Sequence, residues 1–200
     1  MAIHPESKGK ISCVFLGAGE GNRFGSQKLL HKIDGKPLIY YGLKSCVGSS
    51  LEYILVILGD SADMLKEEIY KYFPGEKKIG IVVNKNFKQG MMSSFKLGLK
   101  NCGDSSDGIM MYLGDMPFVR PETINKLLSL RKKERFVIPK IENVLKHPRI
   151  IPSCSFSDFF NLKDNEKGEK ILKKFSRNID EVIFQNRDEF SDIDTLQNIL

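Results

Sequence analysis

The chain has 200 residues, of which 41% are hydrophobic, and its 31 Lys and Arg residues against 25 Asp and Glu residues give a net charge of +6. This length fits one domain, and the composition is typical of a globular protein rather than a disordered one. The longest apolar run, Tyr53–Leu58, is far shorter than the roughly 20 residues that a membrane-spanning helix needs. The polar N-terminal segment and the short apolar run after it do not resemble a signal peptide. We therefore expect a cytoplasmic protein without a membrane partner.

The positive charges and the cysteines indicate neither a nucleic-acid partner nor a zinc site. Lysines are spread along the chain, and the densest basic run, Arg131–Arg135, follows a predicted helix, where positive charge complements the helix dipole. No basic face interleaved with aromatic residues and no nucleic-acid-binding module is present. The four cysteines are scattered without a CxxC motif, and the three histidines lack an HExxH pattern. We expect reduced, mostly structural thiols.

Apolar runs alternate with amphipathic stretches along the chain. In chain order the pattern predicts strand Ile11–Leu16, glycine-rich loop Gly17–Gly25, helix Pro37–Cys46, strand Tyr53–Leu58, helix Ser61–Phe73 capped by Ser61, strand Ile79–Val83, helix Ser93–Lys100, strand Gly108–Leu113, helix Pro121–Lys133, strand Phe136–Pro139, a strand containing Ile150 and Ile151, helical pieces within Ser157–Phe175, strand Val182–Phe184 and helix Thr195–Leu200. Strands that alternate with helices favour βαβ crossovers. We therefore predict one α/β domain over residues 1–200, a Rossmann-like three-layer fold with a mostly parallel sheet.

Two features of this pattern direct the search for function. The alternation breaks between about residues 140 and 177, which predicts an inserted subregion there. In open α/β sheets, ligands bind beyond the carboxyl ends of the strands. Functional residues are therefore expected in the loops after the first, third and fourth strands.

The loop after the first strand has the composition of a phosphate-binding loop. Four glycines fall within Gly17–Gly25, and glycines let backbone N–H groups approach phosphate oxygens. Arg23 can donate a bidentate pair of hydrogen bonds to phosphate, and Lys28 can supply a point charge. Asn22 and Phe24 stand where a dinucleotide fingerprint would need glycine, and no GxxxxGK[ST] motif is present. A triphosphate is favoured over the alternative, a flexible surface loop with solvated charges.

Several stretches together resemble one known family. The sequence LGAGEGNRFGSQKLLHKIDGKPLIYYGL, which begins at Leu16, is similar to the signature of the MobA-like nucleotidyltransferases. Within that family it looks most like the molybdenum cofactor cytidylyltransferase branch. Further similarities lie in Asn84–Leu99, in the LGDMPF run at Leu113–Phe118, in His147-Pro148 and in the DIDT run at Asp192–Thr195.

The resemblance implies nucleotidyl transfer, an in-line attack on the α-phosphorus of a nucleoside triphosphate with pyrophosphate as leaving group. Arg23 and Lys28 are then the predicted catalytic residues. The predicted nucleotide-binding residues are Leu16, Gly17, Ala18, Gly19, Gly21, Gly25, Asn84, Gly90, Ser93 and Ser94. Ser93 and Ser94 are also candidates for helix N-caps.

A magnesium ion is the predicted cofactor. Asp115 follows a buried strand, and a carboxylate there suits Mg²⁺, although a turn residue is the alternative. By resemblance, Asp194 is the second predicted ligand, with Asp192 as a substitute and helix capping as the alternative role.

The acceptor side departs from the family pattern. His147 and Lys170 are the predicted acceptor-binding residues, but Lys170 stands where arginine is expected and Glu169 where a small residue is expected. The subregion at residues 140–177 is the part predicted to bind the acceptor. Resemblance favours CTP over GTP as donor and molybdopterin as the phosphate-bearing acceptor, with a molybdoenzyme or a chaperone as protein partner. The alternatives are a sugar-phosphate or polyol-phosphate nucleotidyltransferase and a non-catalytic nucleotide-binding accessory protein in cofactor insertion.

Overall fold

The computed structural model describes residues 11–19, 27–102 and 106–193. Its strands are β1 (Ile11–Gly17), β2 (Lys32–Ile33), β3 (Lys36–Pro37), β4 (Ile54–Leu58), β5 (Ile79–Val83), β6 (Gly108–Leu113), β7 (Phe136–Ile141), β8 (Val144–Leu145), β9 (Arg149–Pro152) and β10 (Ile179–Phe184). Its α-helices are α1 (Leu38–Val47), α2 (Ala62–Tyr72), α3 (Met91–Cys102), α4 (Pro121–Ser129), α5 (Phe156–Asn161) and α6 (Glu169–Lys174). Short 3₁₀ helices occupy Lys28–Leu30, Phe87–Gln89, Ser153–Ser155, Ser176–Asn178 and Asp188–Phe190.

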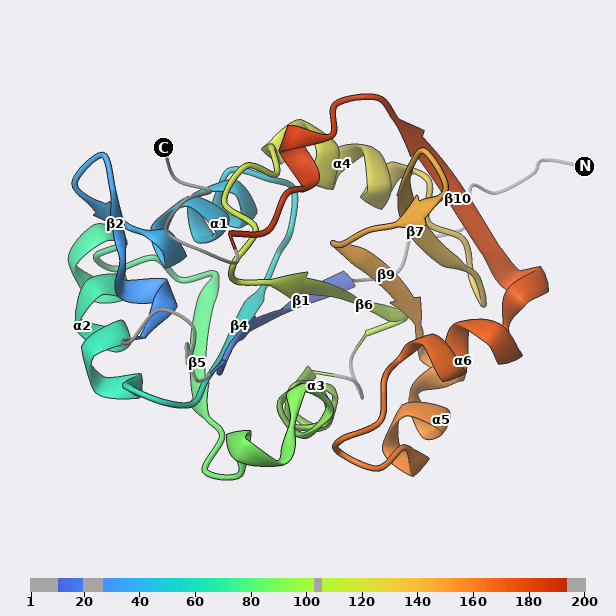
Figure 1. Ribbon diagram of the computed structural model, residues 1–200, viewed down its shortest axis with the longest axis horizontal. Coiled ribbons are helices and arrows are strands. Elements are labelled where there is room, and N and C mark those ends of the chain that lie inside the picture. Colours follow the sequence, from blue (N-terminus) through green and yellow to red (C-terminus); the bar gives the residue numbers. More distant parts are fainter. Residues whose placement is uncertain (1–10, 20–26, 103–105, 194–200) are drawn as a thin grey trace, which may run out of the picture.

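The main sheet has the strand order β10-β7-β9-β6-β1-β4-β5, with β8 paired to β7 (Figure 1). β1 lies between β4 and β6 and is parallel to both. β9 is antiparallel to its neighbours β6 and β7. Its first residue, Arg149, pairs with Met111 near the carboxyl end of β6. The start of β9 therefore lies toward the edge at which the parallel strand β6 ends.

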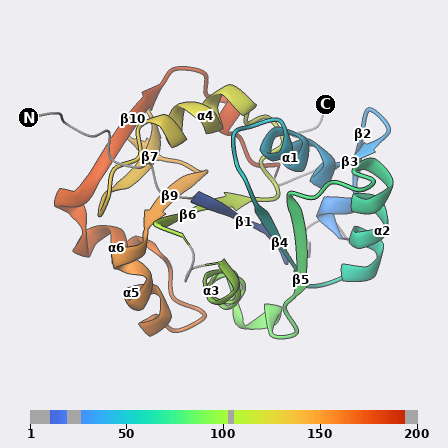
Figure 2. The same cartoon turned by 180° about the vertical axis from the view of Figure 1, so that it is seen from behind.

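Helices cover both faces of this sheet, as the views from the front and from behind agree (Figures 1 and 2). Alternate residues of β1 point to opposite faces, so Cys13 and Phe15 join the core beneath α1, α2 and α4. Val14 and Leu16 join the second core, beneath α3, α5 and α6. This arrangement confirms the predicted α/β domain with a mostly parallel sheet and two helical layers.

The subregion predicted at residues 140–177 extends the same sheet. It contributes β8 and β9 to the sheet and α5 and α6 to the layer that contains α3. The sequence pattern predicted helical pieces within Ser157–Phe175, where α5 and α6 lie, and a strand containing Ile150 and Ile151, which lie in the middle of β9.

The structure corrects several local predictions. α4 ends at Ser129, not Lys133, so Arg131–Arg135 lies in the turn before β7 and not in a helical end. In this turn Arg135 pairs with Asp180 of β10, at 2.6 Å between Nη2 and Oδ1. Ser61 precedes α2 as predicted, but its hydroxyl makes no capping hydrogen bond and donates instead to Asp60. The predicted helix Thr195–Leu200 lies outside the described residues.

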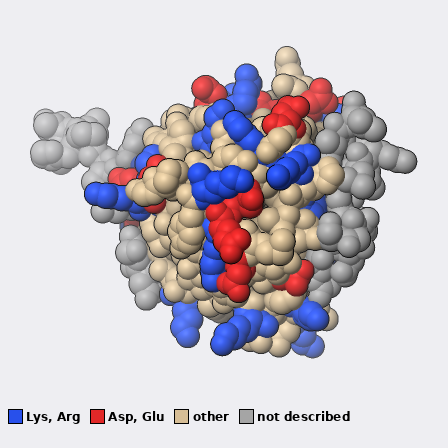
Figure 3. Space-filling view, turned by 90° about the vertical axis from the view of Figure 1, so that its left-hand side faces the viewer, with Lys and Arg blue, Asp and Glu red and all other residues tan. Residues whose placement is uncertain are grey.

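The surface and the thiols add three observations. Positive and negative side chains are interleaved on the face that Figure 3 shows, rather than gathered into a basic patch. All four cysteines are free thiols, three of them buried. No helix within the described ranges is both long enough and apolar enough to cross a bilayer.

Candidate active site

The loops that follow β1, β4 and β6 meet at one edge of the sheet, because these neighbouring strands are parallel. Two glycines permit the close approach of their backbones. A side chain at Gly114 would place its Cβ 2.9 Å from the carbonyl oxygen of Leu16, and one at Gly59 would lie 2.7 Å from that of Ala18. Real Cβ atoms essentially never approach so closely, so both positions require glycine or a shift of the backbone. The predicted loop residues Gly17, Ala18 and Gly19 begin at this edge.

A buried amide holds the far end of the glycine-rich loop against this edge. Gln27 is 6% exposed, and its Nε2 donates to the carbonyl oxygens of Gly19 (3.1 Å) and Asp60 (3.0 Å). Its Oε1 accepts from the backbone of Leu29 as the N-cap of the 3₁₀ helix Lys28–Leu30. Gln27 therefore links the start of the 3₁₀ helix to the connection after β1 and to the connection after β4. Sequence reasoning missed Gln27, because a glutamine in a loop carries no distinguishing signal.

The 3₁₀ helix brings a cation to the carboxylate after β6. Lys28 Nζ lies 2.9 Å from Asp115 Oδ2, and the two side chains are 14% and 30% exposed. The other carboxylate oxygen, Asp115 Oδ1, is buried and has no hydrogen-bond partner among the described residues. A buried carboxylate oxygen without a partner is costly, so a ligand at this atom would be favoured.

This free oxygen provides a test of the predicted metal site. Mg²⁺ prefers oxygen ligands and is often held by one or two protein carboxylates together with phosphates and water. Asp115 Oδ1 fits that requirement. No group of three or more His, Cys, Asp or Glu side chains that could hold a metal occurs in the described part of the chain. Within the described residues, Asp115 is therefore not part of a larger group of metal ligands.

The C-terminal segment returns to the backbone of Asp115. The backbone N–H of Ile193 donates to the carbonyl oxygen of Asp115 at 3.1 Å, and Ile193 is fully buried. Asp192 is exposed. Asp194, the second predicted ligand, lies outside the described residues, although its chain neighbour is anchored at Asp115. Arg23, Gly21 and Gly25 also lie outside them.

Asn84, Ser93 and Ser94 form a buried polar network at the start of α3. Asn84 Nδ2 donates to both serine hydroxyls at 2.9 Å, and Ser93 Oγ donates to the carbonyl oxygen of Gly90 at 2.8 Å. The serines lie inside α3, which begins at Met91, so the predicted N-cap position is wrong for both. Gly90 has a φ of 120°, and a Cβ there would lie 2.5 Å from the carbonyl oxygen of Asp164. The network fixes the connection between β5 and α3.

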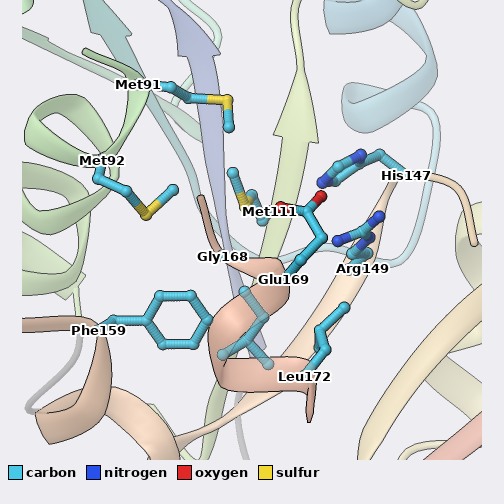
Figure 4. A pocket seen from close by; sticks show the side chains of 10 residues that line it. Met91, Met92, Met111, His147, Arg149, Phe159, Gly168, Glu169 and Leu172 are labelled. Atoms are coloured by element: carbon cyan, nitrogen blue, oxygen red, sulfur yellow. The ribbon is translucent and has the colours of Figure 1, made fainter. Parts of the chain in front are cut away.

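A pocket opens on the α3 side of the sheet, beside the start of β9 (Figure 4). It is small and partly open to solvent, with a cavity volume of about 30 Å³. Its walls come from α3, β6, β9, α5, α6 and the residues before β9, namely Met91, Met92, Met111, His147, Arg149, Ile151, Phe159, Gly168, Glu169 and Leu172. The predicted acceptor residue His147 is thus a wall residue. Lys170 is not; it is exposed and pairs with Glu166 at 2.9 Å.

Two of the basic residues in this pocket have shifted pKa values. Burial lowers the pKa of His147 well below its usual value, and the positive charges of Arg149 and Lys146 lower it further. Burial also lowers the pKa of Arg149, an effect that the negative charge of Glu169 opposes. His147 is therefore neutral at pH 7. Sequence reasoning did not identify Arg149, because it lies in an apolar-looking strand.

Comparison with known proteins places this site in context. The family model of the MobA-like NTP transferase domain matches residues 13–182. The purine catabolism protein PucB of Bacillus subtilis is 26% identical over 186 residues, which cover 91% of this chain and 90% of that protein. The bifunctional protein GlmU of Nitratiruptor sp. is 31% identical over 143 residues, 70% of this chain and 32% of that protein. The chain thus spans about three tenths of the length of the GlmU proteins it matches.

Solved structures share the fold. Rv0371c from Mycobacterium tuberculosis superimposes with a TM-score of 0.82 at 20% identity and covers 94% of both chains; its complex with manganese gives a TM-score of 0.77. A nucleotidyl transferase from Methanothermobacter thermautotroptrophicus gives 0.80 at 19% identity, over 94% of both chains. A 4-diphosphocytidyl-2C-methyl-D-erythritol synthase from Anaerococcus prevotii gives 0.73 at 16% identity, over 96% of this chain and 93% of that one.

Proposed function

Because this chain belongs to the MobA-like NTP transferase family, we propose that it is a metal-dependent nucleotidyltransferase. It would transfer the nucleoside monophosphate part of a nucleoside triphosphate to a phosphate-bearing small molecule and release pyrophosphate. The observation that carries this proposal is the Lys28–Asp115 pair with its free, buried Oδ1, at the sheet edge where the glycine-rich loop begins.

In this proposal the described residues have separate tasks. Lys28 lies where its positive charge would offset the negative charge of the triphosphate and of the leaving pyrophosphate. Asp115 would hold a divalent ion through Oδ1, and that ion, when bound, neutralises phosphate charge and aligns the reacting groups. Gln27 keeps Lys28 close to the loop, and backbone N–H groups after β1 would contact phosphate oxygens. Protein groups here orient and neutralise, which is most of what phosphoryl chemistry requires.

The finer identity of the substrates rests on the sequence resemblance. The motifs favour CTP over GTP as donor, molybdopterin as acceptor and Mg²⁺ as the ion. The manganese complex of Rv0371c is compatible with a divalent ion in this fold. A cytoplasmic location and a molybdoenzyme or chaperone partner belong to the same proposal. The fold likeness to the diphosphocytidyl-methylerythritol synthase keeps a polyol phosphate as the second candidate acceptor.

Pyrophosphate release tests the proposal. Each of the four common NTPs is combined with Mg²⁺ or Mn²⁺ and with molybdopterin, methylerythritol phosphate or a sugar phosphate. We expect release with at least one pair, and a loss of about 10²–10³-fold or more in Lys28→Ala and in Asp115→Ala. Lys66→Ala and Asp63→Ala form the matched control, since that pair lies on exposed α2 at 3.2 Å.

The outcomes separate the candidates. Near-normal turnover in both Lys28→Ala and Asp115→Ala would overturn the assignment of the site. Tight NTP binding without turnover for any acceptor would favour the non-catalytic accessory role. The acceptor that supports the highest kcat/KM distinguishes molybdopterin from a polyol or sugar phosphate.

A further inference from the structure

The pocket beside β9 contains a buried cation, Arg149, that is separate from the Lys28–Asp115 pair. Arg149 is 9% exposed, although arginine is almost never buried without a partner. Its Nε donates to the carbonyl oxygen of Lys146 at 2.9 Å, and its Nη2 donates to that of Leu145 at 3.3 Å. Neutral carbonyls satisfy some of its five N–H groups but leave its charge without a counter-ion.

No carboxylate forms an ion pair with Arg149 in the described part of the chain. The ten ion pairs recorded there involve other cations, so no carboxylate lies within ion-pair distance of the buried guanidinium. Burial of an unpaired charge costs several kcal/mol in order of magnitude. An anion that enters the pocket would recover part of that cost.

The carboxylate of Glu169 points toward Arg149 and His147 across the pocket (Figure 4). It does not reach ion-pair distance, and Glu169 is itself exposed at the start of α6. Its negative charge nevertheless acts on Arg149, because it opposes the pKa decrease that burial causes. Glu169 would therefore compete with a bound anion for the positive charge of Arg149, although its carboxylate lies beyond ion-pair distance.

The other walls define the shape of the ligand around this charge. Met91, Met92 and Phe159 face the pocket from the side opposite Arg149 (Figure 4). Thioether and phenyl groups of this kind contact flat or irregular apolar surfaces. His147, which is neutral, can donate or accept a hydrogen bond but adds no charge. The pocket thus combines one buried positive charge with an apolar wall.

We propose that Arg149 binds an anionic group of the acceptor, distinct from the group that is nucleotidylated, and that Glu169 weakens and filters this binding. The inference rests on the proposed nucleotidyl transfer and names the chemistry of its acceptor: an anionic group, besides the phosphate that is nucleotidylated, that lies beside an apolar wall. Met111, the partner of Arg149 across the sheet, precedes Asp115 by four residues, so the Cα atoms of Met111 and Asp115 lie at most about 14 Å apart, and Arg149 lies one strand, about 5 Å, farther away. The Arg149 pocket and the reaction edge, the sheet edge at which the loops after β1, β4 and β6 meet, can therefore contact two ends of one small molecule.

Anion titration tests this assignment without the natural acceptor. Acetate and inorganic phosphate are titrated separately into the full chain with Mg²⁺ and a saturating non-hydrolysable CTP analogue, which occupies the triphosphate site. The ¹H–¹⁵N signal of Arg149 Nε reports binding at the pocket. We expect a saturable shift with at least one anion, and the tighter of the two indicates whether the acceptor group is a carboxylate or a phosphate.

Variants separate recognition from a structural role. Anion binding should also raise the Tm of the wild-type chain. Arg149→Met should abolish this rise, and Arg149→Lys should retain part of it. Glu169→Gln should bind the anion several-fold more tightly, a result that a purely structural Arg149 would not give. Lys174→Met is the control, because this cation of α6 is exposed and paired with Asp158. If Arg149→Met does not fold, Glu169→Gln and Arg149→Lys still decide the question.

Two results would overturn the proposal: no saturable response in the wild-type chain, or an unchanged anion affinity in Glu169→Gln. Failure of the proposed function has a different signature. In that case no pair of NTP and acceptor would release pyrophosphate, while the response of Arg149 to anions would persist. The two sites can therefore fail independently.

Discussion

At the scale of single residues, the environment of His147 determines its protonation. Arg149 and Lys146 lie close by as positive charges, and Glu169 faces it from α6. Burial and, to a lesser extent, these two positive charges hold the pKa of His147 well below its usual value. The neutral imidazole leaves the positive charge of the pocket on Arg149 alone.

This lowered pKa predicts a pH-dependent stability. The unfolded chain protonates His147 near pH 6.5, whereas the folded chain does so only at lower pH. Below about pH 6.5 the unfolded state therefore binds more protons than the folded state. The free energy of unfolding then decreases by up to about 1.4 kcal/mol for each unit by which the pH is lowered. In urea denaturation, the free energy of unfolding should decrease more steeply for wild type than for His147→Gln as the pH is lowered from 7.5 to 5.5. Parallel curves would contradict the prediction.

The residues of the site differ in how far the sequence could reveal them. Lys28 and Asp115 are recognisable because each follows a glycine turn after a buried strand, and the structure brings them to 2.9 Å. Gln27 and Arg149 are not recognisable in this way. Their roles depend on the backbone carbonyls that surround them, and those positions are set by tertiary packing rather than by a local pattern.

At the scale of elements, the long parallel strands were predictable and the short ones were not. β1, β4, β5 and β6 are continuous apolar runs, as expected for strands covered on both faces. The two-residue strands β2, β3 and β8 are too short to show a period. α4 ends earlier than its charge pattern indicated, because the basic residues after it turn toward Asp180 of β10.

Gly90 connects two elements and gives a prediction at this scale. Its positive φ and the proximity of the Asp164 carbonyl leave no room for a side chain between the start of α3 and the α5–α6 connection. Gly90→Ala should therefore lower the free energy of unfolding by about 3 kcal/mol. Gly75→Ala is the matched control, since Gly75 has a φ of 71° with nothing within 4 Å of the added Cβ. It should cost only about 1 kcal/mol. Equal losses in chemical denaturation would show that the contact with Asp164 is unimportant.

At the scale of the whole molecule, the C-terminal segment is fastened to the reaction edge at two points. Glu189 is 3% exposed and accepts from the backbone and guanidinium of Arg120 and from the hydroxyl of Thr123. Ile193 then fills the core and donates its N–H to Asp115. The last described residues of the chain thus help to position Asp115, which follows β6.

Ile193→Ala should affect both stability and metal binding. Loss of this buried side chain should lower the free energy of unfolding by about 3 kcal/mol. The backbone N–H that Ile193 donates to Asp115 remains in this variant, but it is no longer held in place by a buried side chain, so the affinity for Mn²⁺ should also fall, as measured by calorimetry on the folded protein. Ile69→Ala removes an equally buried side chain from α2 and should weaken stability without changing Mn²⁺ affinity. Identical Mn²⁺ affinities in the two variants would refute the coupling.

The reversed direction of β9 has a consequence for how the protein can diversify. A parallel strand presents its last residues to the reaction edge, but β9 presents its first residue, Arg149, together with His147 before it. The stretch that shapes this pocket is therefore distant in sequence from Gln27, Lys28 and Asp115. Substitutions between His147 and Arg149 can alter which molecule is accepted while the triphosphate machinery stays intact. One scaffold of this kind can serve many acceptors through exchange of a short, separate stretch of chain.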